Sequence, residues 1–265
     1  MARFKALEPS NLWHRFCAMI LYPLTRLLGK RQYVGMEKLN RPGAMLLVGN
    51  HISHLDPMYD VVMIHQAGRI PHVLAKAGLF RIPFVGKALY GTGQIPVERG
   101  SGAGQAALDP AKQVLADGGV VLIYPEGTVT REPNFWPMRP RPGVAALALA
   151  GDFRVVPIVH WGTQKVYNSY ATEGTRKLKL FPRQDVKVVV GDDIDLSEFR
   201  GREVDARAIR DVSLKVMGEL ASMLAEIRGE QAPAQLFDPK KAARLQGSTG
   251  TTERPAAAAT DGDGS

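Results

Sequence analysis

The chain has 265 residues, of which 45% are hydrophobic and 23% charged, and it carries a net charge of +8 with a pI near 9.6. This length gives one large domain or two small ones, and it is enough to bury a core. The single cysteine, Cys17, excludes an internal disulfide framework, and it fits a reducing compartment or an exported protein without disulfide bonds.

Most of the excess charge lies in the first 41 residues, which hold eight basic and two acidic side chains. A basic N-terminal segment favours an anionic membrane surface or nucleic acid as partner. Residues 11–28 mix apolar, aromatic and basic groups, as a helix in a membrane interface does. The alternative is a helix packed on the domain. Pro23 interrupts the apolar run, which is too short to span a bilayer.

Apolar runs that alternate with helical patterns follow along the chain. Strands are expected at 44–48, 72–76, 95–97, 120–124, 155–159, 178–181 and 186–190. Helices are expected at 56–66, 77–90, 106–116, 143–150 and 201–228, with a proline-rich loop at 125–142.

This order predicts an α/β fold, with a mostly parallel or mixed central sheet flanked by helices and an N-terminal interfacial helical segment. We expect residues 1–33 to form the membrane-interface segment and 34–229 the main domain. Residues 230–265 lose the apolar pattern and are expected to be a disordered tail.

The first candidate site follows the strand at 44–48, in the run from Asn50 to Pro57. His51 precedes Asp56 by five residues, and Asp56-Pro57 is a typical helix start. If His51 lies in the turn before that helix, Asp56 can accept the proton of one ring nitrogen and leave the other nitrogen as a base. The simpler interpretation is a structural histidine beside a helix cap.

The second candidate site follows the strand at 120–124, so it lies at the same edge of the sheet. Gly127 allows close approach of a ligand, Thr128 and Thr130 supply hydroxyl groups, and Arg131 matches the geometry of a phosphate. Arg99 follows another short strand. Two arginines and a base at strand ends describe a site for an anionic substrate that loses a proton.

These motifs resemble, in order and spacing, those of the glycerolipid acyltransferases of the lysophosphatidic acid acyltransferase type. The resemblance runs from about Val34 to Val190. It is carried by Asn50-His51-x-Ser53-x-x-Asp56-Pro57, Arg99, Pro125-Glu126-Gly127-Thr128 and Val156-Pro157-Ile158.

The resemblance implies that His51 is the general base and that Asp56 orients it. It implies that Arg99 and the set Glu126, Gly127 and Thr128 hold the phosphate of the acceptor, with Arg131 as a further candidate. Asn50, Ser53, Pro57 and Pro157 support the motifs. The sequence departs from the family pattern where Val129 and Thr130 precede Arg131, and where Ile-Pro-Val-Glu precedes Arg99.

The implied activity is transfer of a fatty acyl group from acyl-CoA or acyl-carrier protein to the sn-2 hydroxyl of lysophosphatidic acid, giving phosphatidic acid. Another lysophospholipid or a glycolipid as acceptor stays open. The implied place is the cytoplasmic face of a membrane, as a peripheral or monotopic protein.

A basic nucleic-acid-binding module is the alternative from another class. Against it, no helix-turn-helix, zinc or single-strand-binding motif occurs, and nucleic acid is not expected as a partner. No Gly-x-Ser-x-Gly or phosphate-loop motif occurs either. The six histidines show no metal-ligand spacing, so neither a metal nor a cofactor is expected.

Overall fold

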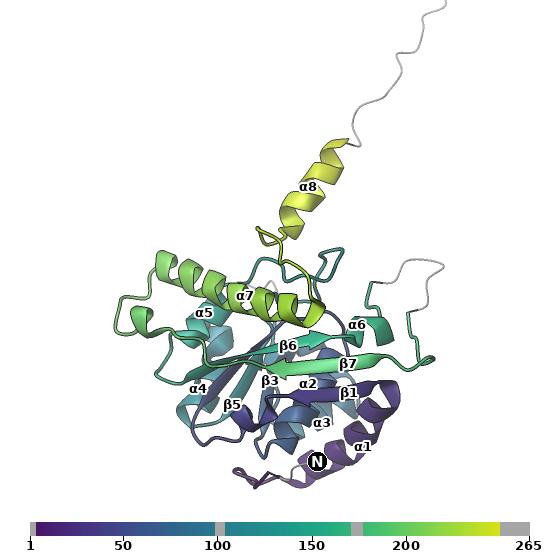
Figure 1. Ribbon diagram of the computed structural model, residues 1–265. Coiled ribbons are helices and arrows are strands. Elements are labelled where there is room, and N and C mark those ends of the chain that lie inside the picture. Colours follow the sequence, from purple (N-terminus) through teal and green to yellow (C-terminus); the bar gives the residue numbers. More distant parts are fainter. Residues whose placement is uncertain (1–3, 99–103, 171–176, 250–265) are drawn as a thin grey trace, which may run out of the picture.

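The computed structural model describes residues 4–98, 104–170 and 177–249 (Figure 1). Its described strands form one seven-stranded sheet in the order β1-β7-β6-β2-β5-β3-β4. Every pair is parallel except β6 with β7, which is antiparallel. The prediction of a mostly parallel or mixed sheet is confirmed. The strands are β1 (Lys30–Val34), β2 (Met45–Gly49), β3 (Pro71–Lys76), β4 (Ile95–Val97), β5 (Val120–Ile123), β6 (Arg154–Trp161) and β7 (Asp185–Val190).

Helices cover both faces of this sheet (Figure 1). They are α1 (Leu12–Leu28), α2 (Asp56–Gln66), α3 (Val85–Gly91), α4 (Asp109–Ala116), α5 (Gly143–Ala148), α6 (Thr163–Val166), α7 (Ala206–Arg228) and α8 (Pro239–Thr249). Short 3₁₀ helices lie at Met36–Leu39, Ala77–Arg81, Gly104–Leu108 and Ser197–Phe199.

The core is divided by the alternation of side chains along the central strands. In β2, Leu46 and Val48 face a cluster made with α4, α5 and α7, whereas Met45 and Leu47 face a second cluster that includes α2. All five β2 residues are buried, as expected of a strand covered on both faces. The sheet therefore presents its strand ends, and not its faces, to ligands.

The N-terminal helix α1 packs on α2 and α3 while keeping one apolar face exposed. Asn11 caps it by accepting a hydrogen bond from the backbone N–H of His14. The packed face agrees with a helix that packs on the domain, whereas the role of α1 at a membrane interface stays a prediction. Within the described ranges, no helix has both the length and the apolar character needed to cross a membrane.

Three predicted elements differ from the structure, and one strand was not predicted. Residues 30–34 form the edge strand β1, which the polar sequence Lys-Arg-Gln-Tyr-Val concealed. Residues 77–90 divide into a 3₁₀ helix and α3 around Pro83. The strand expected at 178–181 is reduced to one isolated bridge at Leu178. Helix α7 begins at Ala206, after its cap Asp205, and not at 201.

The prediction of a disordered tail from residue 230 does not hold for its first part, which makes contacts with the domain. The Phe237 carbonyl accepts a hydrogen bond from the Arg139 backbone, and Asp238 pairs with the Arg139 side chain at 2.7 Å. Helix α8 follows (Figure 1). The contact between Arg139 and Asp238 joins residues 99 positions apart in the chain, so the local apolar pattern gave no signal for it. Residues 250–265 lie outside the described residues.

Candidate active site

The loop after β2 brings His51 and Asp56 together. His51 Nδ1 lies 2.9 Å from Asp56 Oδ2, and the histidine is only 6% exposed. The same carboxylate oxygen accepts the backbone N–H groups of Ile52 at 2.7 Å and Ser53 at 2.8 Å. Asp56 therefore closes the turn that carries His51, and it does not cap α2. The N-cap position belongs to Leu55, with Pro57 in the first helical turn.

Asp56 is fully buried, yet its surroundings favour the charged form. Burial raises the pKa of this carboxyl, but the charge of His160, the hydrogen bond from His51 and the Thr163 hydroxyl together hold the pKa below its ordinary value. Thr163 Oγ1 donates to Asp56 Oδ1 at 2.5 Å. An ionised Asp56 fixes the proton of His51 on Nδ1. Among the described residues nothing hydrogen-bonds to Nε2, so this nitrogen is left as a base.

Glu126 ties the loop after β5 to the loop after β2. Its carboxylate accepts the backbone N–H of His51 at 3.0 Å and that of Met138 at 3.1 Å. In return, the backbone N–H of Thr130 donates to the His51 carbonyl at 2.7 Å. Burial raises the pKa of Glu126 to about 8, although the two backbone hydrogen bonds oppose that rise. The two motif loops therefore form one hydrogen-bonded unit.

A second histidine–aspartate pair lies beneath the first. His160 Nε2 is 2.6 Å from Asp60 Oδ1, and both side chains are completely buried. His160 Nδ1 faces two oxygens of Asn50, the carbonyl at 3.1 Å and Oδ1 at 3.0 Å. Since both ring nitrogens face acceptors, the geometry favours an imidazolium. Burial opposes the charge, but Asp60 and Asp56 raise the pKa of His160 to about 9.

Asn50 also has a defined orientation. Its Oδ1 accepts the backbone N–H of His160 at 2.7 Å, and its Nδ2 donates to the His160 carbonyl at 3.2 Å. The residue preceding His51 is thus fixed across to β6. This pair of backbone contacts explains in physical terms why an amide suits position 50.

Tyr124, the residue after β5, links the two histidine–aspartate pairs. Its hydroxyl donates to Asp60 Oδ2 at 2.6 Å, while its ring stacks on His51. Burial, together with Asp60, raises the pKa of Tyr124 well above the ordinary value, so the hydroxyl keeps its proton. The His51 ring is thus fixed at its edge by Asp56 and on its face by Tyr124.

The segment after α6 packs against the His51 loop. Ser53 Oγ donates to the Tyr167 carbonyl at 2.8 Å, and the backbone N–H of His54 donates to Ser169 Oγ at 3.0 Å. Tyr170 donates to the carbonyl of Val129 at 3.2 Å and lies 3.4 Å from the hydroxyl of Thr128. This segment therefore connects the two motif loops from the outside.

The other site residues predicted from the sequence do not gather as closely as His51, Asp56 and Glu126 do. Gly127 adopts a left-handed conformation, with φ of 71°, which favours glycine. Arg131 is exposed on the same loop, two residues beyond the buried Val129. Pro157 is buried in the middle of β6, in register with Val48 of β2. Arg99 lies outside the described residues.

An arginine that the sequence interpretation missed lies over the Glu126–Gly127 turn. A methyl group built on Gly127 would lie 3.2 Å from Arg141 Cγ and 3.7 Å from Nε. The Arg141 backbone N–H also donates to the Pro125 carbonyl at 2.8 Å. The side chain is exposed. The loop therefore carries a guanidinium group beside Gly127 in addition to the more distant Arg131.

His160, Asp60, Tyr124 and Thr163 were also missed. Two signals in the sequence indicate them. Asp60 follows Asp56 by four residues, which places both carboxylates on one face of α2. His160 is a polar residue within an otherwise apolar strand. Across the three described ranges, no group of three or more histidine, cysteine, aspartate or glutamate side chains is arranged so that it could hold a metal ion.

Comparison with known proteins identifies the family. The acyltransferase family model matches residues 30–161. An N-acylphosphatidylethanolamine synthase of Arabidopsis thaliana is 32% identical over 209 residues, which cover 74% of this chain and 73% of that protein.

A 1-acyl-sn-glycerol-3-phosphate acyltransferase of Borreliella burgdorferi is 30% identical over 50% of this chain. A chloroplastic 1-acyl-sn-glycerol-3-phosphate acyltransferase of Brassica napus is 27% identical over 67% of it. The matched regions span about half the length of these two relatives, 52% and 49% respectively.

The fold also matches a solved structure. The crystal structure of the 1-acyl-sn-glycerophosphate (LPA) acyltransferase PlsC from Thermotoga maritima superposes with a TM-score of 0.61 at 18% identity. The match covers 83% of this chain and 81% of that one, and it supports the fold alone. Taken with the sequence relatives, these matches show that the chain belongs to the acyltransferase family.

Proposed function

We propose that the chain transfers a fatty acyl group from acyl-CoA or acyl-carrier protein to the sn-2 hydroxyl of lysophosphatidic acid, giving phosphatidic acid. The observation that carries the proposal is the 2.9 Å contact between His51 Nδ1 and Asp56 Oδ2. It leaves Nε2 as a base at the carboxyl edge of the sheet. The relatives named as 1-acyl-sn-glycerol-3-phosphate acyltransferases support the acceptor.

The reaction needs one base and no covalent enzyme intermediate. His51 Nε2 takes the proton of the acceptor hydroxyl as its oxygen bonds to the thioester carbonyl carbon. The tetrahedral intermediate then collapses, the carbon–sulfur bond breaks, and the leaving thiolate takes the proton from His51. Asp56 stabilises the imidazolium that exists between these steps. General-base assistance of this kind contributes roughly 10²–10⁴ in rate.

The phosphate of the acceptor is assigned to the loop after β5. Gly127 and Thr128 lie on the partly exposed side of this loop, with Arg131 and Arg141 as cationic groups. Arg141 is closer to Gly127 than the sequence alone indicates. The family that the chain resembles often has an arginine directly after Glu-Gly-Thr, where this chain has Val129, and we assign Arg141 to the role of that arginine. Glu126 uses both carboxylate oxygens on backbone N–H groups. We therefore assign it to positioning the loops, and not to the substrate contact expected from the resemblance.

The acceptor and the product are lipids, and one surface of the molecule suits a membrane. Apolar side chains are exposed on α1 and on the neighbouring segment 79–90; they include Leu12, Phe16, Met19, Ile20, Leu27, Ile82 and Phe84. Phe84 is 80% exposed in a left-handed backbone conformation, with φ of 63°, that disfavours non-glycine residues. We assign this surface to peripheral docking at the cytoplasmic face of a membrane.

The testing experiment follows free thiol release from acyl-CoA and from acyl-carrier protein with a panel of acceptors. We expect lysophosphatidic acid to give the highest kcat/KM and His51→Ala to abolish turnover. Wild-type turnover by His51→Ala would overturn the mechanism. A preference for another lysophospholipid or a glycolipid would overturn the acceptor but keep the reaction.

One relative favours a second candidate. The Arabidopsis protein, whose name gives N-acylation of phosphatidylethanolamine, matches 74% of this chain, a larger share than the Borreliella or the Brassica acyltransferase matches. An amine acceptor also loses a proton on acylation, so His51 serves this reaction equally. Phosphatidylethanolamine therefore belongs in the acceptor panel, with the N-acyl product as the readout.

A further inference from the structure

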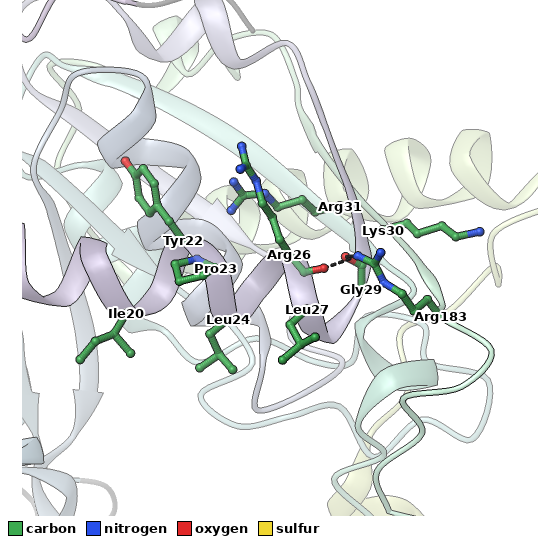
Figure 2. Close-up of a pocket in the computed structure, with 10 residues that line it drawn as sticks. All are labelled: Ile20, Tyr22, Pro23, Leu24, Arg26, Leu27, Gly29, Lys30, Arg31 and Arg183. Atoms are coloured by element: carbon green, nitrogen blue, oxygen red, sulfur yellow. Dashed lines mark hydrogen bonds between the residues drawn. The ribbon is translucent and has the colours of Figure 1, made fainter.

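A hollow of about 1070 Å³ lies where the C-terminal half of α1 meets the start of β1 (Figure 2). It is built from elements other than the loops that carry the proposed acyl-transfer site. Four of its lining side chains are basic and none is acidic. The basic residues are Arg26, Lys30, Arg31 and Arg183, and the apolar wall includes Ile20, Leu24 and Leu27.

Arg31 has hydrogen-bonding capacity that its surroundings do not use. Nη1 donates to Thr25 Oγ1 at 2.7 Å. Nε and Nη2 are buried and have no hydrogen-bond partner in the described part of the chain. The rings of Tyr22 and Tyr33 lie 5.9 and 5.3 Å from the guanidinium carbon. A buried guanidinium without an anionic partner is costly, and an anion bound in the hollow would offset that cost.

A second unsatisfied donor lies behind Gly29, which also lines the hollow. The Tyr59 hydroxyl is buried without a hydrogen-bond partner in the described ranges, and the whole residue is 0% exposed. A methyl group built on Gly29 would lie 3.0 Å from this hydroxyl oxygen. Tyr59 belongs to α2, one turn beyond Asp56. The hollow therefore adjoins the helix that carries Asp56.

Arg183 is fixed in place at the rim. Its Nη2 donates to the Gly29 carbonyl at 3.1 Å and to the Arg26 carbonyl, both at the C-terminal end of α1. Figure 2 shows the guanidinium groups of Arg26 and Arg31 on one side of α1, and Leu24 and Leu27 pointing to the other. The lining thus combines cationic donors with aliphatic side chains, among them the exposed Leu27, which is the combination that an anionic lipid requires.

We propose that this hollow binds the phosphate group of an anionic phospholipid in the membrane surface, with the glycerol end of its acyl chains against Leu24 and Leu27. The inference rests on the membrane docking of α1 in the proposed function. It adds a specific headgroup site to that docking. Binding there would hold the carboxyl edge of the sheet close to the lipid surface.

The test measures co-sedimentation with phosphatidylcholine vesicles, with and without phosphatidylglycerol. Losing the charge-assisted hydrogen bonds of one arginine should weaken binding to the anionic vesicles roughly tenfold. Arg31→Gln tests this, with Arg207→Gln on the exposed start of α7 as a control of equal charge change. Thermal unfolding shows whether Arg31→Gln remains folded.

A second pair of variants uses exposed residues only. Arg26→Gln with Lys30→Gln should lose anionic binding, whereas Arg207→Gln with Arg210→Gln should retain it. Binding to pure phosphatidylcholine should stay the same in all of them, because the apolar face of α1 is unchanged. Equal losses in the two pairs would mean general electrostatic attraction, and would overturn the site.

Competition identifies the source of the phosphate. Displacement by short-chain phosphatidylglycerol, but not by equal inorganic phosphate, supports a lipid headgroup; equal displacement by both assigns the hollow to free phosphate and overturns the proposal. These measurements need no acyl transfer. A protein that binds but shows no turnover contradicts only the proposed function, and an active protein whose two variant pairs bind equally contradicts only this site.

Discussion

The ring of Tyr124 lies parallel to that of His51, with 4.3 Å between the ring centroids and 20° between the planes. The Tyr124 hydroxyl is fixed by Asp60, which also pairs with His160. The orientation of the proposed base therefore depends on the buried hydrogen bonds of Tyr124, Asp60 and His160. We expect His51 to react with the substrate and Tyr124, Asp60 and His160 to position it.

Replacing Tyr124 by phenylalanine keeps the stacked ring and removes the hydroxyl. Asp60 Oδ2 then loses its donor in a buried place, and we expect the free energy of unfolding to fall by about 1–3 kcal/mol. The value of kcat should fall less than with Tyr124→Leu, which removes the stacked ring, while KM stays constant in both. Urea unfolding and steady-state kinetics measure these effects, and an unchanged unfolding free energy in Tyr124→Phe would contradict them.

Asp56→Asn should reduce kcat by roughly 10²–10⁴, because an amide no longer fixes the proton of His51 on Nδ1. Since the pKa of Asp56 lies below its ordinary value, wild-type activity should not fall near neutral pH through protonation of this group. Single-turnover thiol release across pH measures both effects. Asp152→Asn, at an exposed carboxylate, is the control and should behave as wild type.

Arg141→Ala should raise KM for a phosphorylated acceptor about tenfold and leave KM for the acyl thioester unchanged, since one charge-assisted contact is lost. Arg131→Ala should have a smaller effect, because of these two described arginines it is Arg141 that lies against Gly127. Arg207→Ala controls for the change in overall charge. Equal rises in KM for both substrates would show that Arg141 does not contact the acceptor phosphate.

The ionisation of His160 should make the free energy of unfolding fall as the pH rises into the alkaline range. Its pKa rises from 6.5 to about 9 on folding, so its contribution is complete below pH 6.5 and is lost as the pH rises through 9. Against the neutral variant His160→Gln, the loss should be on the order of 3 kcal/mol. Urea unfolding of both proteins on either side of this range tests it, since other titrating groups are common to both. Parallel pH profiles would mean that His160 is neutral in the folded protein.

Phe84→Gly separates membrane binding from stability. Glycine relieves the left-handed backbone conformation, so the melting temperature should stay the same or rise. Losing a phenylalanine from the apolar surface should weaken binding to phosphatidylcholine vesicles by roughly tenfold or more. The control is Leu178→Gly, at an exposed residue outside the main helices and strands. Leu214 is also exposed, but it lies inside α7, where glycine would destabilise the helix. Unchanged vesicle binding by Phe84→Gly would exclude this surface from docking.

The central strands and the loops that follow them could be predicted because they combine apolar runs with local motifs. His51 and Asp56 lie within one turn, so their contact depends on neighbouring residues only. The partners of His160 are different: Asp60 lies 100 residues away and Asn50 lies 110 away. A single sequence gives no spacing rule for contacts of that separation. The pairing of β2 with β6 brings Asn50 to His160, and helix α2 carries Asp60.

Edge elements were the other difficulty. Strand β1 is half-exposed and polar, so it lacks the apolar run by which the central strands are found. The position of Arg141 could not be predicted, because it belongs to a loop without periodicity. Its approach to Gly127 depends on how that loop folds. In both cases the conformation depends on contacts with distant parts of the chain, which the local sequence does not reveal.

The pairing of β1 with β7 has a consequence for how the chain is made. β1 lies at the edge of the sheet and its neighbour β7 ends at Val190, so the strand that follows α1 finds its partner only after the chain has been synthesised as far as Val190. Contacts between distant segments form late and slow folding. During translation, the apolar face of α1 is therefore available to a membrane or a chaperone before the rest of the domain has folded.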